Sequence, residues 1–211
     1  MTNFVYLIEI IGTIAFAISG AIVAIDKNMD VFGVIVLGMT TAVGGGMIRD
    51  VLLDNLPPMM FLNPIYVIVA VVTSILVFLL MYLLKGKNNR YSKQMDHCLN
   101  VFDSVGLGVF VVTGVNTAIS NGFSELAFLS IFVGVLTGVG GGILRDMLAG
   151  KVPVIFQKRV YAVAAIAGAS AYYYINDWIG TNMAMLVGIA LTLSIRMLAT
   201  YFEWNLPRIN K

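Results

Sequence analysis

The sequence predicts an all-α integral membrane protein, and three observations support this fold class. Hydrophobic residues make up 59% of the 211 residues and charged residues only 11%, whereas soluble domains carry about 25% charged residues. The mean hydropathy is +0.92, so the chain cannot cover a water-facing surface with polar side chains. Apolar segments of about 20 residues, long enough to cross a bilayer as helices, recur along the chain. Residues 1–211 are therefore expected to form a single transmembrane domain.

Seven apolar segments are predicted as transmembrane helices, and most of the connectors between them are short and polar. The predicted helices cover residues 4–25, 31–53, 62–84, 101–119, 125–149, 159–176 and 179–201. No lysine or arginine precedes the first segment. This segment therefore lacks the basic start of a signal peptide and is expected to be an uncleaved helix. The longest connector is expected between residues 85 and 100.

The distribution of lysine and arginine predicts the orientation in the membrane. These residues are concentrated after the first, third and fifth segments and in the C-terminal tail. With seven spans these regions share one side, which the positive-inside rule assigns to the cytoplasm. The connectors of the other side carry acidic residues such as Glu125 and Asp177. We expect an inner-membrane, multi-pass protein with its N-terminus outside and its C-terminus in the cytoplasm.

One motif occurs twice, as TAVGGGMIRDVLL from Thr41 and as TGVGGGILRDMLA from Thr137, 96 residues later. The similarity extends upstream, where Glu9 matches Asp103 at an offset of 94. The chain is therefore predicted to contain two copies of a three-helix unit. The first predicted unit covers residues 4–84 and the second covers residues 98–176. A seventh helix with a C-terminal tail is predicted at residues 179–211. Since each copy has an odd number of spans, the second copy is inverted relative to the first, as in many transporters.

Each glycine triplet is predicted to break its helix and to face an ion pathway. Glycine in a helix interior costs about 1 kcal/mol relative to alanine. An opened turn would expose carbonyl groups, which a bilayer tolerates only when protein buries them or a water-filled cavity faces them. Such carbonyls are good ligands for cations. Close helix packing by small residues is the alternative. The glycines concerned are Gly44, Gly45, Gly46, Gly140, Gly141 and Gly142.

An arginine and an aspartate follow each glycine triplet near a membrane end. On a helix, Asp50 and Asp146 point about 100° away from the preceding Arg49 and Arg145, so each arginine is expected to find another partner. The predicted ion pairs are Glu9–Arg49 and Asp103–Arg145. Such pairs are often functional. The alternatives are a purely structural ion pair within each repeat and an arginine that snorkels to lipid headgroups. Arg196 in the seventh segment is expected to snorkel.

The sequence shows no catalytic constellation. It contains no Ser/His/Asp set, no Cys/His cluster suited to a metal and no phosphate-binding loop. The net charge of +2 provides no basic face for nucleic acid. An intramembrane enzyme that uses Asp50 and Asp146 is the weaker alternative. We therefore expect a conduit for a small solute, without a cofactor and without a resident metal.

Two copies of a three-helix unit with GGGxxRD in the second helix, followed by a seventh helix, resemble the trimeric intracellular cation (TRIC) channel family. The prokaryotic branch of that family is also labelled glycine-transporter-like. The resemblance covers nearly the whole chain and implies a homotrimer in membrane lipids, with one pore in each subunit between its two repeats. It also implies that Gly44–Gly46 and Gly140–Gly142 flank a path for monovalent cations, chiefly potassium, with sodium as the other candidate.

An inverted repeat fits alternating access as well as a pore. A secondary transporter of glycine or another small amino acid is therefore the rival hypothesis, and a non-conducting scaffold is the third. A channel predicts passive, ion-selective current, a carrier predicts saturable uptake, and a scaffold predicts no flux. Residues 101–119 contain no lysine or arginine, so we do not expect steep voltage gating.

Overall fold

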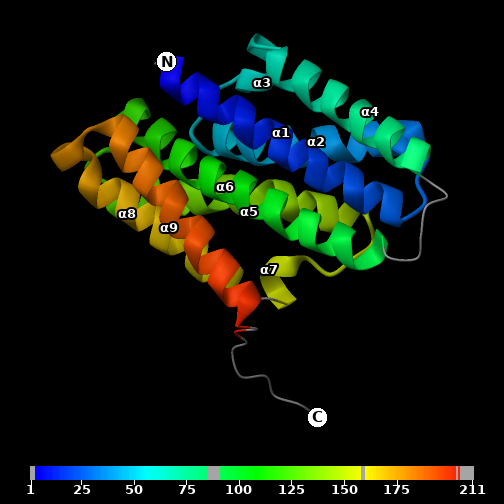
Figure 1. The fold of residues 1–211 in the computed structure, drawn as a ribbon. Coiled ribbons are helices and arrows are strands. Elements are labelled where there is room, and N and C mark those ends of the chain that lie inside the picture. Colours follow the sequence, from blue (N-terminus) through cyan, green and yellow to red (C-terminus); the bar gives the residue numbers. More distant parts are fainter. Residues whose placement is uncertain (1–2, 85–90, 158–159, 203, 205–211) are drawn as a thin grey trace.

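The computed structural model describes residues 3–84, 91–157, 160–202 and 204, and this part of the chain is built from helices. The long helices are α1 (Asn3–Asp26), α2 (Val31–Leu52), α4 (Ile65–Leu84), α5 (Tyr91–Ala118), α6 (Ala127–Leu148), α8 (Val160–Ile179) and α9 (Thr181–Tyr201). The short elements are α3 (Met59–Leu62), the π-helical turn η1 (Ile119–Phe123) and α7 (Val154–Gln157). Figure 1 shows their arrangement.

Six of the described helices, which are all the long ones except α8, are long and apolar enough to cross a membrane. Helix α8 has 20 residues, but its C-terminal half contains three tyrosines at 172–174 and the polar residues Asn176 and Asp177. These side chains make α8 less apolar than its neighbours. Length and composition therefore support six of the seven predicted spans, and the sixth span in chain order, α8, stays a prediction.

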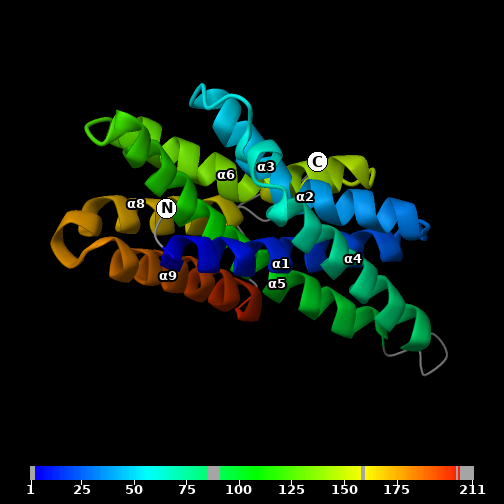
Figure 2. The same ribbon diagram turned by 90° about the horizontal axis from the view of Figure 1, so that it is seen from above.

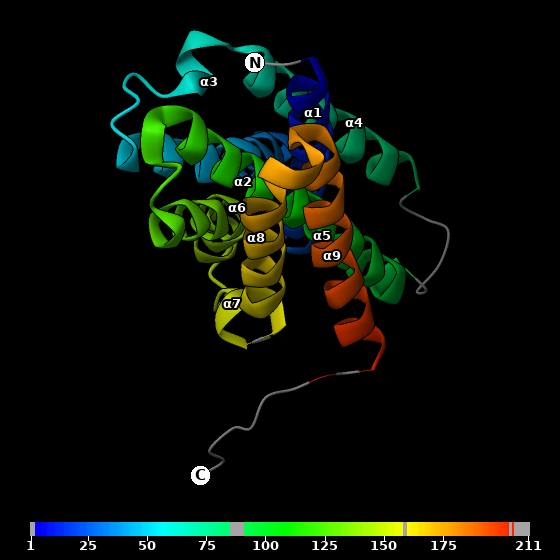
Figure 3. The same cartoon turned by 90° about the vertical axis from the view of Figure 1, so that its left-hand side faces the viewer.

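The helices form two three-helix units that run in opposite directions. In Figures 1 and 2, α1 and α5 run antiparallel through the centre of the molecule, and so do α2 and α6. Helix α4 packs on α1 and α2, whereas α8 packs on α5 and α6. Helix α9 packs on α5 and α8, and Figure 3 shows α4 on a different side of the central helices from the α8–α9 pair. This is the predicted inverted arrangement with one added helix.

Reciprocal contacts between matched residues reveal the two-fold relation of the units. Phe16 on α1 packs so tightly on Gly106 of α5 that a side chain at Gly106 would overlap its ring. In turn, Phe110 on α5 lies against Gly12 of α1, with its ring edge 3.2 Å from where a Cβ would stand. The centroids of the two phenylalanine rings are 5.2 Å apart. A contact in which each unit offers the same surface to the other is the mark of a two-fold interface.

The prediction that the glycine triplets break their helices is wrong. Helices α2 and α6 continue through both triplets with helical backbone geometry. The reason is close packing: a Cβ at Gly45 would overlap the Thr137 carbonyl oxygen, and a Cβ at Gly141 would overlap the Thr41 carbonyl oxygen. Backbones can approach this closely only where side chains are absent. The glycines therefore serve the crossing of α2 and α6.

The predicted connector between residues 85 and 100 is also partly wrong, because α5 already begins at Tyr91. Its first turns are polar, which masks them in a hydropathy reading. Asn100 in this extension donates a hydrogen bond to Thr200 on α9 at 2.8 Å. Helix α5 therefore extends beyond its apolar segment and remains in contact with the end of α9.

Candidate functional site

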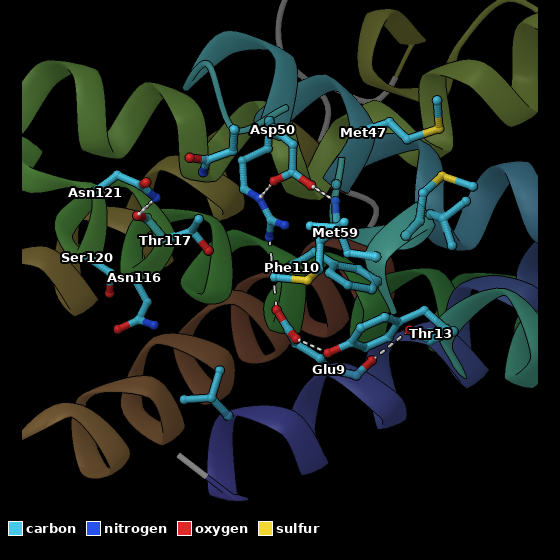
Figure 4. A pocket seen from close by; sticks show the side chains of 18 of the residues that line it. Glu9, Thr13, Met47, Asp50, Met59, Phe110, Asn116, Thr117, Ser120 and Asn121 are labelled. Atoms are coloured by element: carbon cyan, nitrogen blue, oxygen red, sulfur yellow. Dashed lines mark hydrogen bonds and ion pairs between the residues drawn. The ribbon is translucent and has the colours of Figure 1, made fainter. Parts of the chain in front are cut away.

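A cavity of about 880 Å³ lies where the first Arg-Asp motif ends α2. Residues of α1, α2, α3 and α4 and of the segment 54–57 line it, together with the end of α5, the turn η1 and Thr181 at the start of α9. Phe110 and Gly46 are among the lining residues, so the cavity reaches from the polar end of these helices toward the α2–α6 crossing. Figure 4 shows the labelled side chains around it.

Glu9 lies in the wall of this cavity and is nearly buried. One oxygen of its carboxylate, Oε2, accepts a hydrogen bond of 2.7 Å from the Tyr66 hydroxyl of α4. The other oxygen, Oε1, lies 4.0 Å from the Arg49 Nη1 atom. The predicted Glu9–Arg49 pair is therefore present, but its distance is at the limit for an ion pair, and a tyrosine makes the closer contact.

Asp50 holds Arg49 from the other side, which the helix geometry did not predict. The Arg49 Nε donates to Asp50 Oδ1 at 2.8 Å, and Asp50 Oδ2 accepts a bond of 2.9 Å from the Met59 backbone N–H. The arginine side chain folds back at the helix end, so the two neighbours meet despite their different directions. Asp50 thus connects the end of α2 to the start of α3. We call Glu9, Arg49, Asp50 and Tyr66 the first charge cluster.

The ionisable side chains that line the cavity carry more negative than positive charge. They are the carboxylates of Glu9, Asp50 and Asp54 and the guanidinium of Arg49. Neutral polar groups add further oxygen atoms, and Figure 4 shows them gathered on one wall. These are Asn116, Thr117, Ser120 and Asn121. A hollow lined in this way concentrates cations.

The matching charges of the second repeat are packed tightly together. Arg145 Nη1 lies 2.6 Å from Asp103 Oδ1, as predicted, and Arg145 Nε lies 2.9 Å from Asp146 Oδ1. Asp146 Oδ2 accepts a bond of 2.8 Å from the Val154 backbone N–H at the start of α7, just as Asp50 does at α3. Arg145 Nη1 also donates a short hydrogen bond to Ser19 Oγ on α1, so it links the two repeats.

The prediction that Arg196 snorkels to the lipid interface is wrong. Its side chain is buried, and its Nη2 lies 3.2 Å from Asp103 Oδ2 and 3.0 Å from the side-chain oxygen of Asn100. The guanidinium also stands 4.3 Å from the centre of the Tyr161 ring. Asp103 attracts the arginine inward, since a carboxylate with two oxygens can accept two arginines. We call Asp103, Arg145, Asp146 and Arg196 the second charge cluster.

Sequence reasoning missed Tyr66, Ser19 and the partners of Arg196. Tyr66 could have been found, because Tyr161 stands 95 residues later at the equivalent place in the second repeat. Ser19 has a hydroxyl counterpart, Thr113, 94 residues later, but nothing in the sequence shows that it faces Arg145. Arg196 lies in the helix that has no counterpart. Its neighbours follow only from the packing of α9 on α5 and α8.

The glycine triplets lie between the two charge clusters. Arg49 follows Gly45 by one helical turn, and Arg145 follows Gly141 by one turn. Because α2 and α6 cross in opposite directions at these glycines, the clusters lie on opposite sides of the crossing. In the part of the chain that the structure describes, no group of three or more His, Cys, Asp or Glu residues could hold a metal ion.

Sequence comparison identifies relatives along nearly the whole chain. A family model described as "Glycine transporter" matches residues 6–82 and 100–177. The UPF0126 inner membrane protein YadS of Escherichia coli (strain K12) is 43% identical over 207 residues, which cover 96% of this chain and 95% of YadS. A UPF0126 membrane protein of Deinococcus radiodurans is 37% identical over 202 residues, which cover 95% of this chain and 89% of that protein.

Solved structures of TRIC channels also match nearly the whole chain. A TRIC cation channel studied for its conductance matches with a TM-score of 0.82 and 36% identity over 97% of both chains. The TRIC trimeric intracellular cation channel orthologue from Rhodobacter sphaeroides matches with a TM-score of 0.85 and 32% identity, covering 96% of this chain and 100% of that one. A prokaryotic TRIC channel in 0.5 M KCl matches with a TM-score of 0.88 and 31% identity, covering 98% of this chain and 100% of that one.

Proposed function

The chain belongs to the family of the UPF0126 proteins and the prokaryotic TRIC channels, and on this basis we propose that it conducts monovalent cations, chiefly potassium. Each protomer of a homotrimer holds its own path, which runs between the two repeats. The close structural matches of the chain are ion channels and not enzymes. Potassium and sodium are the permeant ions to be compared, and no cofactor takes part.

The observation that carries this proposal is the cavity beside the α2–α6 crossing. Three carboxylates and one guanidinium line it, so its field attracts cations and repels anions. Side-chain amides and hydroxyls on the opposite wall supply neutral oxygen ligands, which suit a weakly held and rapidly exchanging ion. A zwitterion such as glycine would need a cationic group whose charge is not already compensated. Arg49 has Asp50 at 2.8 Å and Glu9 at 4.0 Å, so two carboxylates already compensate the one cation that lines the cavity.

The glycine triplets support a narrow section of the path at the crossing. Gly46 lines the cavity, and the neighbouring Gly45 and Gly141 bring the two repeats into backbone contact. A small relative movement of α2 and α6 would widen or narrow this section directly, because backbone meets backbone at Gly45 and Gly141. The proposed path therefore passes Gly44–Gly46 and Gly140–Gly142, with one charge cluster toward each end.

The proposed topology places the N-terminus outside and the C-terminus in the cytoplasm, in the inner membrane. The positive-inside rule supports it, and so does an ion pair of 2.8 Å between Asp26 at the end of α1 and Lys151 after α6. These two connectors must share a side in a seven-span inverted repeat. With this orientation the cavity opens to the outside, and the second charge cluster lies toward the cytoplasm.

The test is to record the purified full-length protein in planar bilayers with a gradient of potassium chloride. We expect unitary currents whose reversal potential shifts toward the potassium equilibrium potential, and a smaller shift when sodium replaces potassium. Uptake of labelled glycine into proteoliposomes is measured in parallel. Absence of unitary current together with saturable glycine uptake would overturn the proposal in favour of a carrier. Absence of both would favour a scaffold.

A further inference from the structure

Ser19 and Thr113 stand at equivalent positions of the two repeats, yet only the Ser19 hydroxyl has a hydrogen-bond partner. Ser19 matches Thr113 at the same offset of 94 residues that relates Glu9 to Asp103. Ser19 Oγ accepts the short hydrogen bond from Arg145. Thr113 is also fully buried, but within the described part of the chain its hydroxyl has no hydrogen-bond partner. A buried hydroxyl without a partner is rare and requires an explanation.

The hydroxyl of Thr113 differs from those of the other buried threonines of these helices. Thr13, Thr41 and Thr137 each donate to the carbonyl oxygen four residues earlier in their own helix. Thr113 makes no such bond, so its hydroxyl is free for another group. It lies on the face of α5 between Phe110 and Thr117, one turn from each, and both of these line the cavity. Thr113 itself is fully buried and is not among the lining residues, so it lies behind the wall that these two residues help to form.

Two equivalent trios follow from this match. The second trio is Asp103, Arg145 and Ser19, in which the arginine bonds its acid at 2.6 Å and reaches across to the serine of the other repeat. The first trio is Glu9, Arg49 and Thr113, in which the arginine is 4.0 Å from its acid and the threonine is unbonded. The second trio is closed across the repeat interface and the first is open.

We propose that the first trio is a gate of the conduction path, open in this structure, which closes when Arg49 binds Thr113 as Arg145 binds Ser19. This inference rests on the proposed function only in taking the cavity to be part of the path. On closing, the Arg49 guanidinium leaves the cavity wall and crosses to α5. It then bonds Glu9 and the Thr113 hydroxyl, and its positive charge stands in the way of a cation.

The cavity itself gives a readout that needs no ion flux. Ala42 on α2 lines the cavity, so Ala42→Cys places a thiol there, and Cys98→Ser removes the native cysteine. The protein is reconstituted in nanodiscs, and the rate at which a positively charged methanethiosulfonate reagent labels the thiol is measured. Thr113→Asp adds a carboxylate that attracts Arg49 and should slow the labelling by about tenfold, the change produced by one charge-assisted hydrogen bond.

A companion variant shows whether Arg49 is responsible. Adding Arg49→Gln to Thr113→Asp should restore the original labelling rate, because the attraction is lost. An unchanged rate in Thr113→Asp, or a slow rate that persists without Arg49, would overturn the gate.

A neutral variant serves if the aspartate disrupts folding. Thr113→Asn offers Arg49 an amide oxygen and should slow the labelling by about threefold, since a neutral acceptor bonds an arginine more weakly. No slowing in a folded Thr113→Asn protein would also overturn the gate. These outcomes are independent of the bilayer recordings: missing current contradicts the proposed channel, whereas only the labelling rates decide on the gate.

Discussion

The two charge clusters have matching sequences but different surroundings. Glu9 faces a cavity, holds one tyrosine and lies 4.0 Å from its arginine. Asp103, its counterpart, binds Arg145 at 2.6 Å and Arg196 at 3.2 Å and does not line this cavity. The difference comes from α9, which has no counterpart in the repeats and delivers Arg196 to the second cluster. An inverted repeat builds two equivalent ends, and the additional helix makes them unequal.

The difference matters for conduction, because a path needs an entrance for water and ions. Glu9 and Arg49 line the cavity and lie 4.0 Å apart, so separating this pair costs less than separating a pair in close contact. Charges that are buried together lose this freedom, since separating them leaves each one without solvation. The first cluster is therefore suited to movement and the second to holding the repeats together.

Replacing the acid of each cluster should reveal this difference most strongly. Among the described residues, Asp103 is the only acid that Arg196 contacts and one of the two that Arg145 contacts. Asp103→Asn should therefore lower the free energy of unfolding by about 3–5 kcal/mol. Glu9→Gln should cost about 1 kcal/mol, because water in the cavity and the Tyr66 hydroxyl remain as partners. Unfolding of the purified proteins in detergent measures both values, and equal losses would contradict the comparison.

The shared parts of the two clusters could be predicted from the sequence. In each repeat an acid and an arginine lie near the same side of the membrane, at positions that match between the repeats. This pattern predicted both ion pairs. The bonds of Asp50 and Asp146 were missed, because the 100° separation on a helix ignores how far an arginine side chain can fold back. The overall fold was predictable for a similar reason, since hydropathy and the offset of 96 residues define the helices and their inversion.

The features that break the symmetry could not be predicted from the sequence. Arg196 was assigned to the lipid interface, because nothing local in its helix indicates that Asp103 and Asn100 lie beside it. The glycine triplets suited both a break and a close crossing, and only the positions of the Thr41 and Thr137 carbonyl groups decide between them.

The glycine crossing should respond symmetrically, in contrast to the charge clusters. Gly45→Ala and Gly141→Ala each place a methyl group against a backbone carbonyl oxygen of the other repeat, and each should cost about 1–3 kcal/mol of unfolding free energy. Gly46→Ala is the matched control, since the nearest atom to its Cβ is Arg49 Nη2 at 3.8 Å. This control should be neutral or slightly stabilising, because alanine favours helix. Thermal unfolding of the three variants compares them, and tolerance of only one of the two crossing variants would show that the crossing is not reciprocal.

Replacing the matched tyrosines should give the smallest difference in unfolding free energy between the two clusters, because each change removes a single hydroxyl oxygen. Tyr66→Phe removes the bond of 2.7 Å to Glu9 and should cost about 1 kcal/mol. Tyr161→Phe should cost nothing measurable, because in the described part of the chain the Tyr161 hydroxyl makes no hydrogen bond of ordinary geometry. The ring that faces Arg196 stays in place. Chemical unfolding of both variants measures the two costs. A larger loss for Tyr161→Phe would mean that this hydroxyl binds Asp103 in the membrane, and the second cluster would then resemble the first more closely than the structure indicates.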